Sequence, residues 1–556
     1  MSEVKDKREL NTENTTERAS SNDAAQLLLK GTTILAAAGI ASKILGAIFR
    51  IPLTNMIGAK GQSYYSVAYN IYYLLYVLAT AGFPVAISRM VSARIAKNDH
   101  INAHKSYKLA MKVSVTLGAL GFAFLFFGAG AIANAYKIPG AEASIRALSL
   151  ALLITPLVAT LRGYYQGRQQ MSSTAITEIV EQFFRVVVGL SLAYSFYKTS
   201  LEKAAGGATF GASVGTTAAL VVMYVIYIRD KNNRASMFEQ SRIIDETDKQ
   251  RLKELIRFII PITLGAIVLP LMFNIDSAMV VRRLLASGWD RATAETKFGL
   301  MSGFVDPIVS LPNIFIDAIC ISLMPAVTTA YTLKNQAQLD NHVRTGLKTM
   351  MIIATPCTVG LIVLAKPILT MLFYKRMDEA IMAVPLLRIL ALSIVATAIM
   401  RTFLVSLQGI GQMMIPIWNL CIGAVFKAVV SYTLLGVYAI NVSGAPIGSI
   451  AAYVVAGILN YFALKKHANI KIDAAGVFIK PLLSAAIMGV ATMLVYKLSF
   501  MIIGSNTLSV FISILAALIV YFITVFKTGA VTKDEIQLMP KGDLIYKFAV
   551  KMKIAQ

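Results

Sequence analysis

Cysteine, histidine and charged side chains are scarce in this chain of 556 residues. It has 3 cysteines and 4 histidines, and only 15% of its residues are charged, whereas soluble domains carry about a quarter. The cysteines lie in apolar segments and the histidines in predicted loops, without the spacing of a disulfide framework or a metal site. No HExxH or GxxxxGK[ST] motif occurs, which argues against a zinc protease or an ATP-binding loop. We therefore expect no catalytic residues, no metal, no cofactor and no enzymatic activity.

Long apolar runs make up most of the sequence instead. Hydrophobic residues account for 56% of the chain, and a helix needs roughly 20 of them in a row to cross a membrane. About fourteen segments meet that criterion. They begin near Thr32, Tyr64, Met111, Ala147, Thr174, Phe210, Phe258, Gly299, Thr349, Ile381, Met413, Ile447, Pro481 and Leu508. The predicted fold class is an all-α polytopic membrane protein with about 14 transmembrane helices.

The net charge of +24 is attributed to loops at the membrane surface rather than to binding of nucleic acid. Lys and Arg gather in alternate loops, which is typical of cytoplasmic loops that contact anionic lipid. This pattern predicts a multi-pass protein of the cytoplasmic membrane with both termini cytoplasmic. A few cations fall on the predicted outer side, as exceptions to the pattern: Arg282, Arg283, Arg291, Lys297, Lys375 and Arg376.

The two halves of the sequence resemble each other. QGRQQM at Gln166–Met171 recurs as QGIGQM at Gln408–Met413, and the same offset places Phe184–Arg185 on Phe426–Lys427. Such a repeat predicts two pseudo-symmetric six-helix lobes plus two C-terminal helices. The expected division is a disordered cytoplasmic tail (1–30), an N-terminal lobe (31–229), a cytoplasmic linker (230–255), a C-terminal lobe (256–466), helices 13 and 14 (479–527) and a cytoplasmic amphipathic tail (528–556).

Ionisable side chains within apolar segments are costly in a bilayer, so each is a candidate for function. Lys43 and Arg50 share one face of the first predicted span, and Lys43 has no acidic neighbour one helical turn away. Asp306, Asn313 and Asp317 share one face of the eighth span. All five are predicted to bind substrate, with Asp306 or Asp317 as the partner of Lys43 when the site is empty. The structural alternatives are snorkelling cations and hydrogen bonds between helices.

A second group of buried charges has two open interpretations. Glu181 and Arg185 have the spacing of an ion pair on one helix, and a structural pair is favoured over a role in coupling. Glu178 is left over and is a candidate proton acceptor. Asp276 in the seventh span is an isolated acid.

Four tyrosines form a stripe along one face of the predicted second span. Its members are Tyr65, Tyr69, Tyr72 and Tyr76. Such a stripe could stack on sugar rings, but an interfacial belt or a core is the favoured interpretation.

Four segments carry a resemblance to a known family. They are SKILGAIFRIPLTNMIG (Ser42–Gly58), AGFPVAISRMVSARI (Ala81–Ile95), RGYYQGRQQMSSTAITEIVEQFFRVVVG (Arg162–Gly189) and LPNIFIDAICISLMPAV (Leu311–Val327). Together they resemble the polysaccharide exporters of the multidrug/oligosaccharidyl-lipid/polysaccharide superfamily. The similarity is to the branch of the Gram-positive lipid II flippases and stage V sporulation protein B.

The resemblance implies fourteen helices in two lobes around a cation-lined cavity, working by alternating access. The implied function is export of an undecaprenyl-pyrophosphate-linked cell-wall precursor, lipid II, or of a related polysaccharide repeat unit. The implied partners are a lipid-linked oligosaccharide or muropeptide, membrane lipids and a coupling ion, proton or sodium. The family's cavity arginines map approximately onto Lys43 and Arg50.

Two other functions fit a protein of this class. A cation-coupled multidrug exporter would favour acids in the first lobe, and Lys43 and Arg50 argue against it. A non-transport membrane component of wall synthesis, such as a transferase, would carry clustered acids or histidines in a loop, and the sequence has no such cluster.

Overall fold

The structure, a computed structural model, describes residues 2–239, 241–242, 245–470, 473 and 475–531. No strand occurs within these ranges. Thirteen of the described helices are long and apolar enough to cross a membrane, which confirms the predicted all-α polytopic class. The first of them, Thr33–Ile95, contains a break at Gly58, so the number of crossings stays a prediction.

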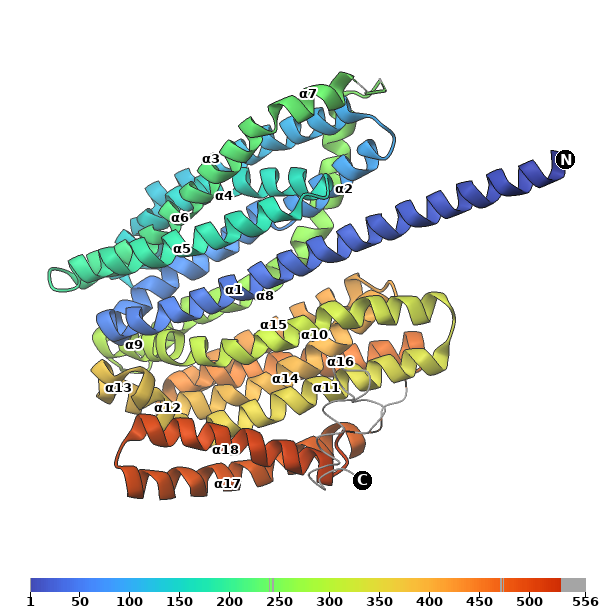
Figure 1. Ribbon diagram of the computed structural model, residues 1–556. Helices are drawn as coiled ribbons and strands as arrows, with labels where there is room; N and C mark the ends of the chain where they lie inside the picture. The colour runs from blue at the N-terminus through green and yellow to red at the C-terminus, as the bar shows by residue number, and fades with distance from the viewer. Residues whose placement is uncertain (1, 240, 243–244, 471–472, 474, 532–556) are drawn as a thin grey trace.

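The first half of the chain forms seven helices. They are α1 (Ser2–Thr80), α2 (Phe83–Ile95), α3 (His100–Ala135), α4 (Glu142–Gly167), α5 (Met171–Phe196), α6 (Leu201–Arg229) and the short α7 (Lys231–Glu239). Figure 1 shows α2 to α7 gathered as one group, with α1 running along its edge. Helices α5 and α6 approach closely because Gly215 has no side chain, and a Cβ there would lie 2.3 Å from the Glu181 carbonyl oxygen.

The second half repeats this arrangement. Helix α8 (Asp248–Ala286) connects the halves and is followed by α9 (Arg291–Gly299), a π-helical segment (Leu300–Val305), α10 (Asp306–Thr332), α11 (Gln336–Val363), α12 (Ala365–Leu372), α13 (Met377–Met382), α14 (Val384–Gly409), α15 (Met414–Leu435) and α16 (Gly444–Ala468). Helices α14, α15 and α16 follow α4, α5 and α6 at nearly the offset of the sequence repeat. Helices α17 (Lys480–Ile503) and α18 (Asn506–Lys527) pack side by side at the edge of this second group in Figure 1.

The disorder predicted for residues 1–30 stays a prediction, and in the structure residues 2–30 form the start of α1. Helix α1 begins at Ser2, and no glycine or proline interrupts residues 2–30. Figure 1 shows this end projecting beyond the other helices. Residues 532–556 of the predicted amphipathic tail lie outside the described residues, and the division of the chain into tails, lobes and linker stays a prediction.

Helix α1 changes direction at one residue. Gly58 has φ 64° and ψ −174°, a backbone conformation that only glycine adopts at little cost. The described side chains between Thr33 and Arg50 are mostly exposed or half-buried, whereas Leu53, Ala59 and Gln62 around the break have no exposed surface. The residues around Gly58 are therefore buried between the two halves, whereas the side chain of Lys43 remains accessible.

Candidate functional site

Three charged side chains from three helices meet between the two halves. Lys43 Nζ on α1 donates a hydrogen bond to Asp317 Oδ2 on α10 at 2.7 Å. The other carboxylate oxygen, Oδ1, accepts one from the guanidinium of Arg401 on α14. The side chains remain accessible, at 51% for Lys43, 34% for Asp317 and 23% for Arg401. One carboxylate thus pairs with two cations, and all three side chains keep exposed surface.

Two of the three residues in this cluster were predicted from the sequence. Lys43 is paired with Asp317, which was one of its two expected partners. Arg401 was missed, although it lies in the apolar run Val395–Val405. The criterion that selected Lys43, an ionisable group within a hydrophobic segment, would also have selected Arg401.

Among the described residues, the other substrate-binding candidates form no hydrogen bond or ion pair with this cluster. Arg50 Nη1 donates to the Ser302 carbonyl at 3.4 Å, and its guanidinium lies 5.7 Å from the ring centres of both Tyr65 and Tyr69. Such a cation over two rings is held by their negative faces. Tyr65 is 5% exposed, so this end of the tyrosine stripe belongs to the core.

Asp306 and Asn313 share α10 with Asp317 but do not join its ion pairs. Among the described residues Asp306 forms no hydrogen bond or ion pair, and its charge interacts at longer range with Asp276, Arg50 and Lys427. Asn313 donates to the Val309 carbonyl at 3.5 Å, and its side-chain oxygen is buried without a partner. Both residues therefore retain hydrogen-bonding capacity for a ligand.

Asp276 is not isolated, contrary to the sequence-based interpretation. Lys427 Nζ on α15 donates to its Oδ2 at 2.6 Å, and the lysine side chain is only 2% exposed. Lys427 and Arg185 occupy equivalent positions of the sequence repeat, so each half carries a cation at this position. Burying a charge without a partner is expensive, which explains why each of these cations lies against an acid.

Glu181 forms the expected ion pair with Arg185, at 3.0 Å, and a second one that the sequence did not suggest. Arg162 Nη2 on α4 donates to the other oxygen of Glu181 at 3.1 Å. The Glu181 side chain is 13% exposed. Glu178, one turn earlier, forms no hydrogen bond or ion pair within the described part of the chain. Glu181 thus joins Arg162 of α4 to Arg185 of α5.

This geometry predicts unequal effects of substitution on folding. Glu181→Gln leaves two cations without their acid, and losing one partner of a buried pair costs about 3–5 kcal/mol. Arg162→Gln leaves Glu181 paired with Arg185 and should cost less. The amount of protein in membranes, measured by fluorescence of a C-terminal fusion, should fall most for Glu181→Gln. Glu178→Gln is the matched control, and normal levels of Glu181→Gln with lost export would instead assign the cluster to transport.

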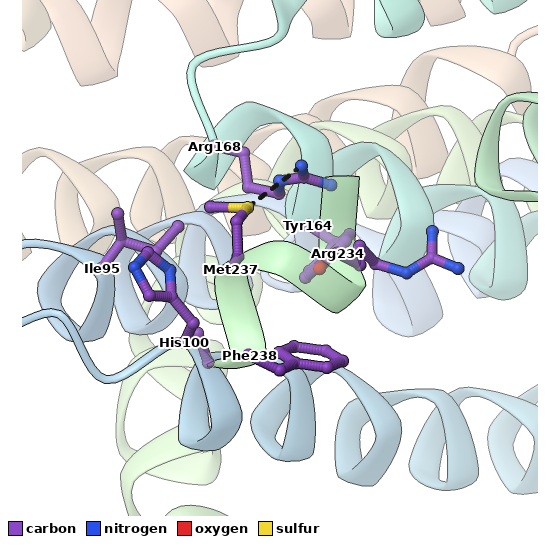
Figure 2. Close-up of a pocket in the computed structure, with 8 residues that line it drawn as sticks. Ile95, His100, Tyr164, Arg168, Arg234, Met237 and Phe238 are labelled. Atoms are coloured by element: carbon purple, nitrogen blue, oxygen red, sulfur yellow. Dashed lines mark hydrogen bonds between the residues drawn. The ribbon is translucent and has the colours of Figure 1, made fainter. Parts of the chain in front are cut away.

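A small pocket near the linker is lined by a second pair of arginines that share one acid. Figure 2 shows it lined by His100, Tyr164, Arg168, Arg234 and Phe238, among others. Arg168 contacts Met237 Sδ at 3.5 Å. Both arginines form ion pairs with the same acid, Asp230, and Arg234 also donates to the Tyr227 carbonyl at 2.6 Å. These contacts fix α7 against the first half of the chain.

Comparisons of sequence agree with this architecture. Residues 28–330 match the family described as polysaccharide biosynthesis protein, and residues 261–433 match the MatE family. The lipid II flippase MurJ of Bacillus subtilis (strain 168) is 28% identical over 483 residues, which are 84% of this chain and 88% of MurJ. Stage V sporulation protein B of the same organism is 23% identical over 523 residues, 93% of this chain and 98% of the relative.

Comparisons of structure show the same fold. A lipid II flippase MurJ in an inward closed conformation matches with a TM-score of 0.63 and 16% identity, covering 88% of this chain and 98% of the other. A multidrug resistance MATE family transporter in an inward-facing conformation matches with a TM-score of 0.63 and 15% identity, covering 77% and 94%. The chain therefore belongs to the polysaccharide biosynthesis protein family.

Proposed function

We propose that this flippase exports a lipid-linked cell-wall precursor, lipid II or a related polysaccharide repeat unit, across the cytoplasmic membrane. The observation that carries the proposal is the cluster of Lys43, Asp317 and Arg401 between the halves. A diphosphate that leaves water needs compensating cations, and charge-assisted hydrogen bonds to Lys and Arg supply them. Two cations that share one carboxylate have an excess of positive charge for such a cargo.

The cluster also supplies a physical link between binding and movement. Asp317 pairs with both cations while the site is empty and connects α10 to α1. An anionic cargo competes with Asp317 for Lys43 and Arg401, so binding releases this connection between the halves. A ligand shifts a conformational equilibrium only through such a difference in contacts. The sugar head would then cross in the accessible region around Lys43 while the polyprenyl tail stays in lipid.

The main competing function is multidrug export. The MatE match to residues 261–433 favours it, as does the likeness to a multidrug transporter. The charges argue against it, because a cationic drug would meet two cations and one paired acid at this cluster. Coupling to a proton or a sodium ion and the cytoplasmic placement of both termini stay predictions.

The lipid that copurifies with the protein tests the proposal. We expect mass spectrometry of lipid extracted from purified protein to detect a polyprenyl diphosphate carrying sugar. Lys43→Ala combined with Arg401→Ala should reduce its amount about 10-fold or more, because each removes a charge-assisted hydrogen bond. Lys112→Ala, which removes an exposed cation of α3, is the control. Recovery of a drug-like cation, or no polyprenyl lipid in any sample, would contradict the proposal.

A further inference from the structure

The break in α1 at Gly58 creates two helix ends inside the protein. Each helix end leaves backbone groups without a partner in the helix: carbonyls where a helix stops and N–H groups where the next one starts. Here both ends lie at the same residue and are buried, with Ile57 2% and Ala59 0% exposed. Water cannot satisfy these groups, so other parts of the chain must do so.

The partners come from the other half of the chain. Arg376 Nη2 donates to the carbonyl of Met56, before the break, at 2.8 Å. Glu379 Oε2 accepts from the N–H of Ala59, after the break, at 2.7 Å. A cation therefore lies at the C-terminal end of one helix and an acid at the N-terminal end of the next, which are the favourable positions for the helix dipole. Both side chains belong to the short segment that contains α13.

The surrounding contacts tighten the same junction. Asn55 Nδ2 donates to the Leu372 carbonyl at 2.8 Å, and Asn55 Oδ1 accepts from the Lys375 N–H at 3.2 Å. Glycine is required on both of the helices that meet at this junction, at Gly58 of α1 and at Gly299 of α9. A Cβ at Gly58 would lie 3.1 Å from Glu379 Oε1, and one at Gly299 would lie 1.7 Å from the Ala59 carbonyl oxygen. The two halves thus meet here without intervening space.

This junction also explains an exception in the distribution of charge. Arg376 lies on the predicted outer side, where the loop pattern disfavours cations. Its contact with Met56 gives it a local role that does not depend on the membrane. The halves are therefore in close contact around Gly58, whereas the side chain of Lys43, earlier on α1, keeps exposed surface.

We propose that Arg376 and Glu379 form a clamp that holds this end of the flippase closed by capping the two helix ends at Gly58. Opening at this end separates α13 from α1, which breaks both caps and leaves the Met56 carbonyl and the Ala59 N–H unsatisfied. The strength of the clamp therefore sets how often the protein opens here. The inference rests on the alternating access of the proposed function, but it concerns the conformational equilibrium without cargo.

Reactivity of a buried cysteine tests the clamp in purified protein. Ser302 is 4% exposed, and its hydroxyl has no hydrogen-bond partner, so Ser302→Cys should disturb little. The native Cys320, Cys357 and Cys421 are replaced with alanine. A maleimide should label this protein slowly. Arg376→Gln and Glu379→Gln should each accelerate labelling about 5-fold, the usual effect of losing a helix cap.

Neighbouring residues provide matched controls. The side chains of Lys375 and Asp378 are exposed and, among the described residues, form no hydrogen bond or ion pair with α1, so Lys375→Gln and Asp378→Asn should label at the unmodified rate. Exchanging the charges, Arg376→Glu with Glu379→Arg, places each charge at the wrong helix end and should accelerate labelling at least as much as either single change. Restoration of slow labelling by this exchange would overturn the capping argument, because a simple charge pair would tolerate it.

A distance measurement gives an independent answer. Spin labels at Lys198 and Val437, which are exposed residues of opposite halves, should report a longer distance for a larger fraction of molecules when Arg376 or Glu379 is substituted. Only variants that elute as folded protein in size-exclusion chromatography are compared. Unchanged distances and unchanged labelling in both substituted proteins would refute the clamp, whatever lipid the protein carries.

Discussion

Replacing Lys43 with alanine is expected to abolish export while leaving the protein folded. Lys43 is 51% exposed at its side chain, so its removal leaves no buried cavity and no desolvated partner. Asp317 keeps its ion pair with Arg401. The loss falls on the cargo, because a charge-assisted hydrogen bond to a diphosphate is worth about 1.5–3 kcal/mol. This corresponds to roughly 10- to 150-fold in transport rate.

Complementation of a flippase-depleted strain measures this effect, with membrane levels checked by immunoblot. Lys43→Arg should retain much of the activity, since the diphosphate needs mainly the positive charge. Arg401→Ala should resemble Lys43→Ala, and Lys112→Ala should behave as the unmodified protein. Full activity of well-expressed Lys43→Ala would remove this residue from the site and leave Arg50 as the next candidate.

Replacing Lys427 with methionine is expected to produce the opposite pattern, a loss of stability. Lys427 is 2% exposed, and its ammonium group lies 2.6 Å from Asp276 Oδ2. The other oxygen of Asp276 is already buried without a hydrogen-bond partner. Removing the cation leaves a charged acid with no compensation, at a cost of about 3–5 kcal/mol. The thermal unfolding midpoint of detergent-purified protein should fall accordingly.

The double substitution separates this explanation from a loss of packing. Lys427→Met with Asp276→Leu replaces the whole pair by apolar groups, which is often neutral or stabilising, and should restore most of the midpoint. Lys43→Met is the comparison, because it removes a cation of similar length from an accessible pair and should change the midpoint little. A Lys427→Met protein as stable as the unmodified one would show that Asp276 does not need its partner.

The sequence alone determined the fold class and showed which charged side chains would be costly to place in the bilayer. Apolar runs of membrane-spanning length predicted the helices, and the repeat of QGRQQM and QGIGQM predicted two similar halves. These features are local, since a helix satisfies its own backbone within one segment. The cost of a charge in hydrocarbon is local too, and it identified Lys43, Asp317, Glu181 and Asp276 as residues that need a partner or a ligand.

Only the tertiary structure decided which partners those residues have. Arg401 reaches Asp317 from α14, Lys427 reaches Asp276 from α15, and Arg162 reaches Glu181 from α4. The caps at Gly58 come from Arg376 and Glu379, more than half the chain away. Contacts between helices depend on rotation and register, which follow from the packing of whole surfaces and leave no periodic signal in the sequence. For this reason the sequence identified charges that needed compensation, and the fold determined how each was compensated.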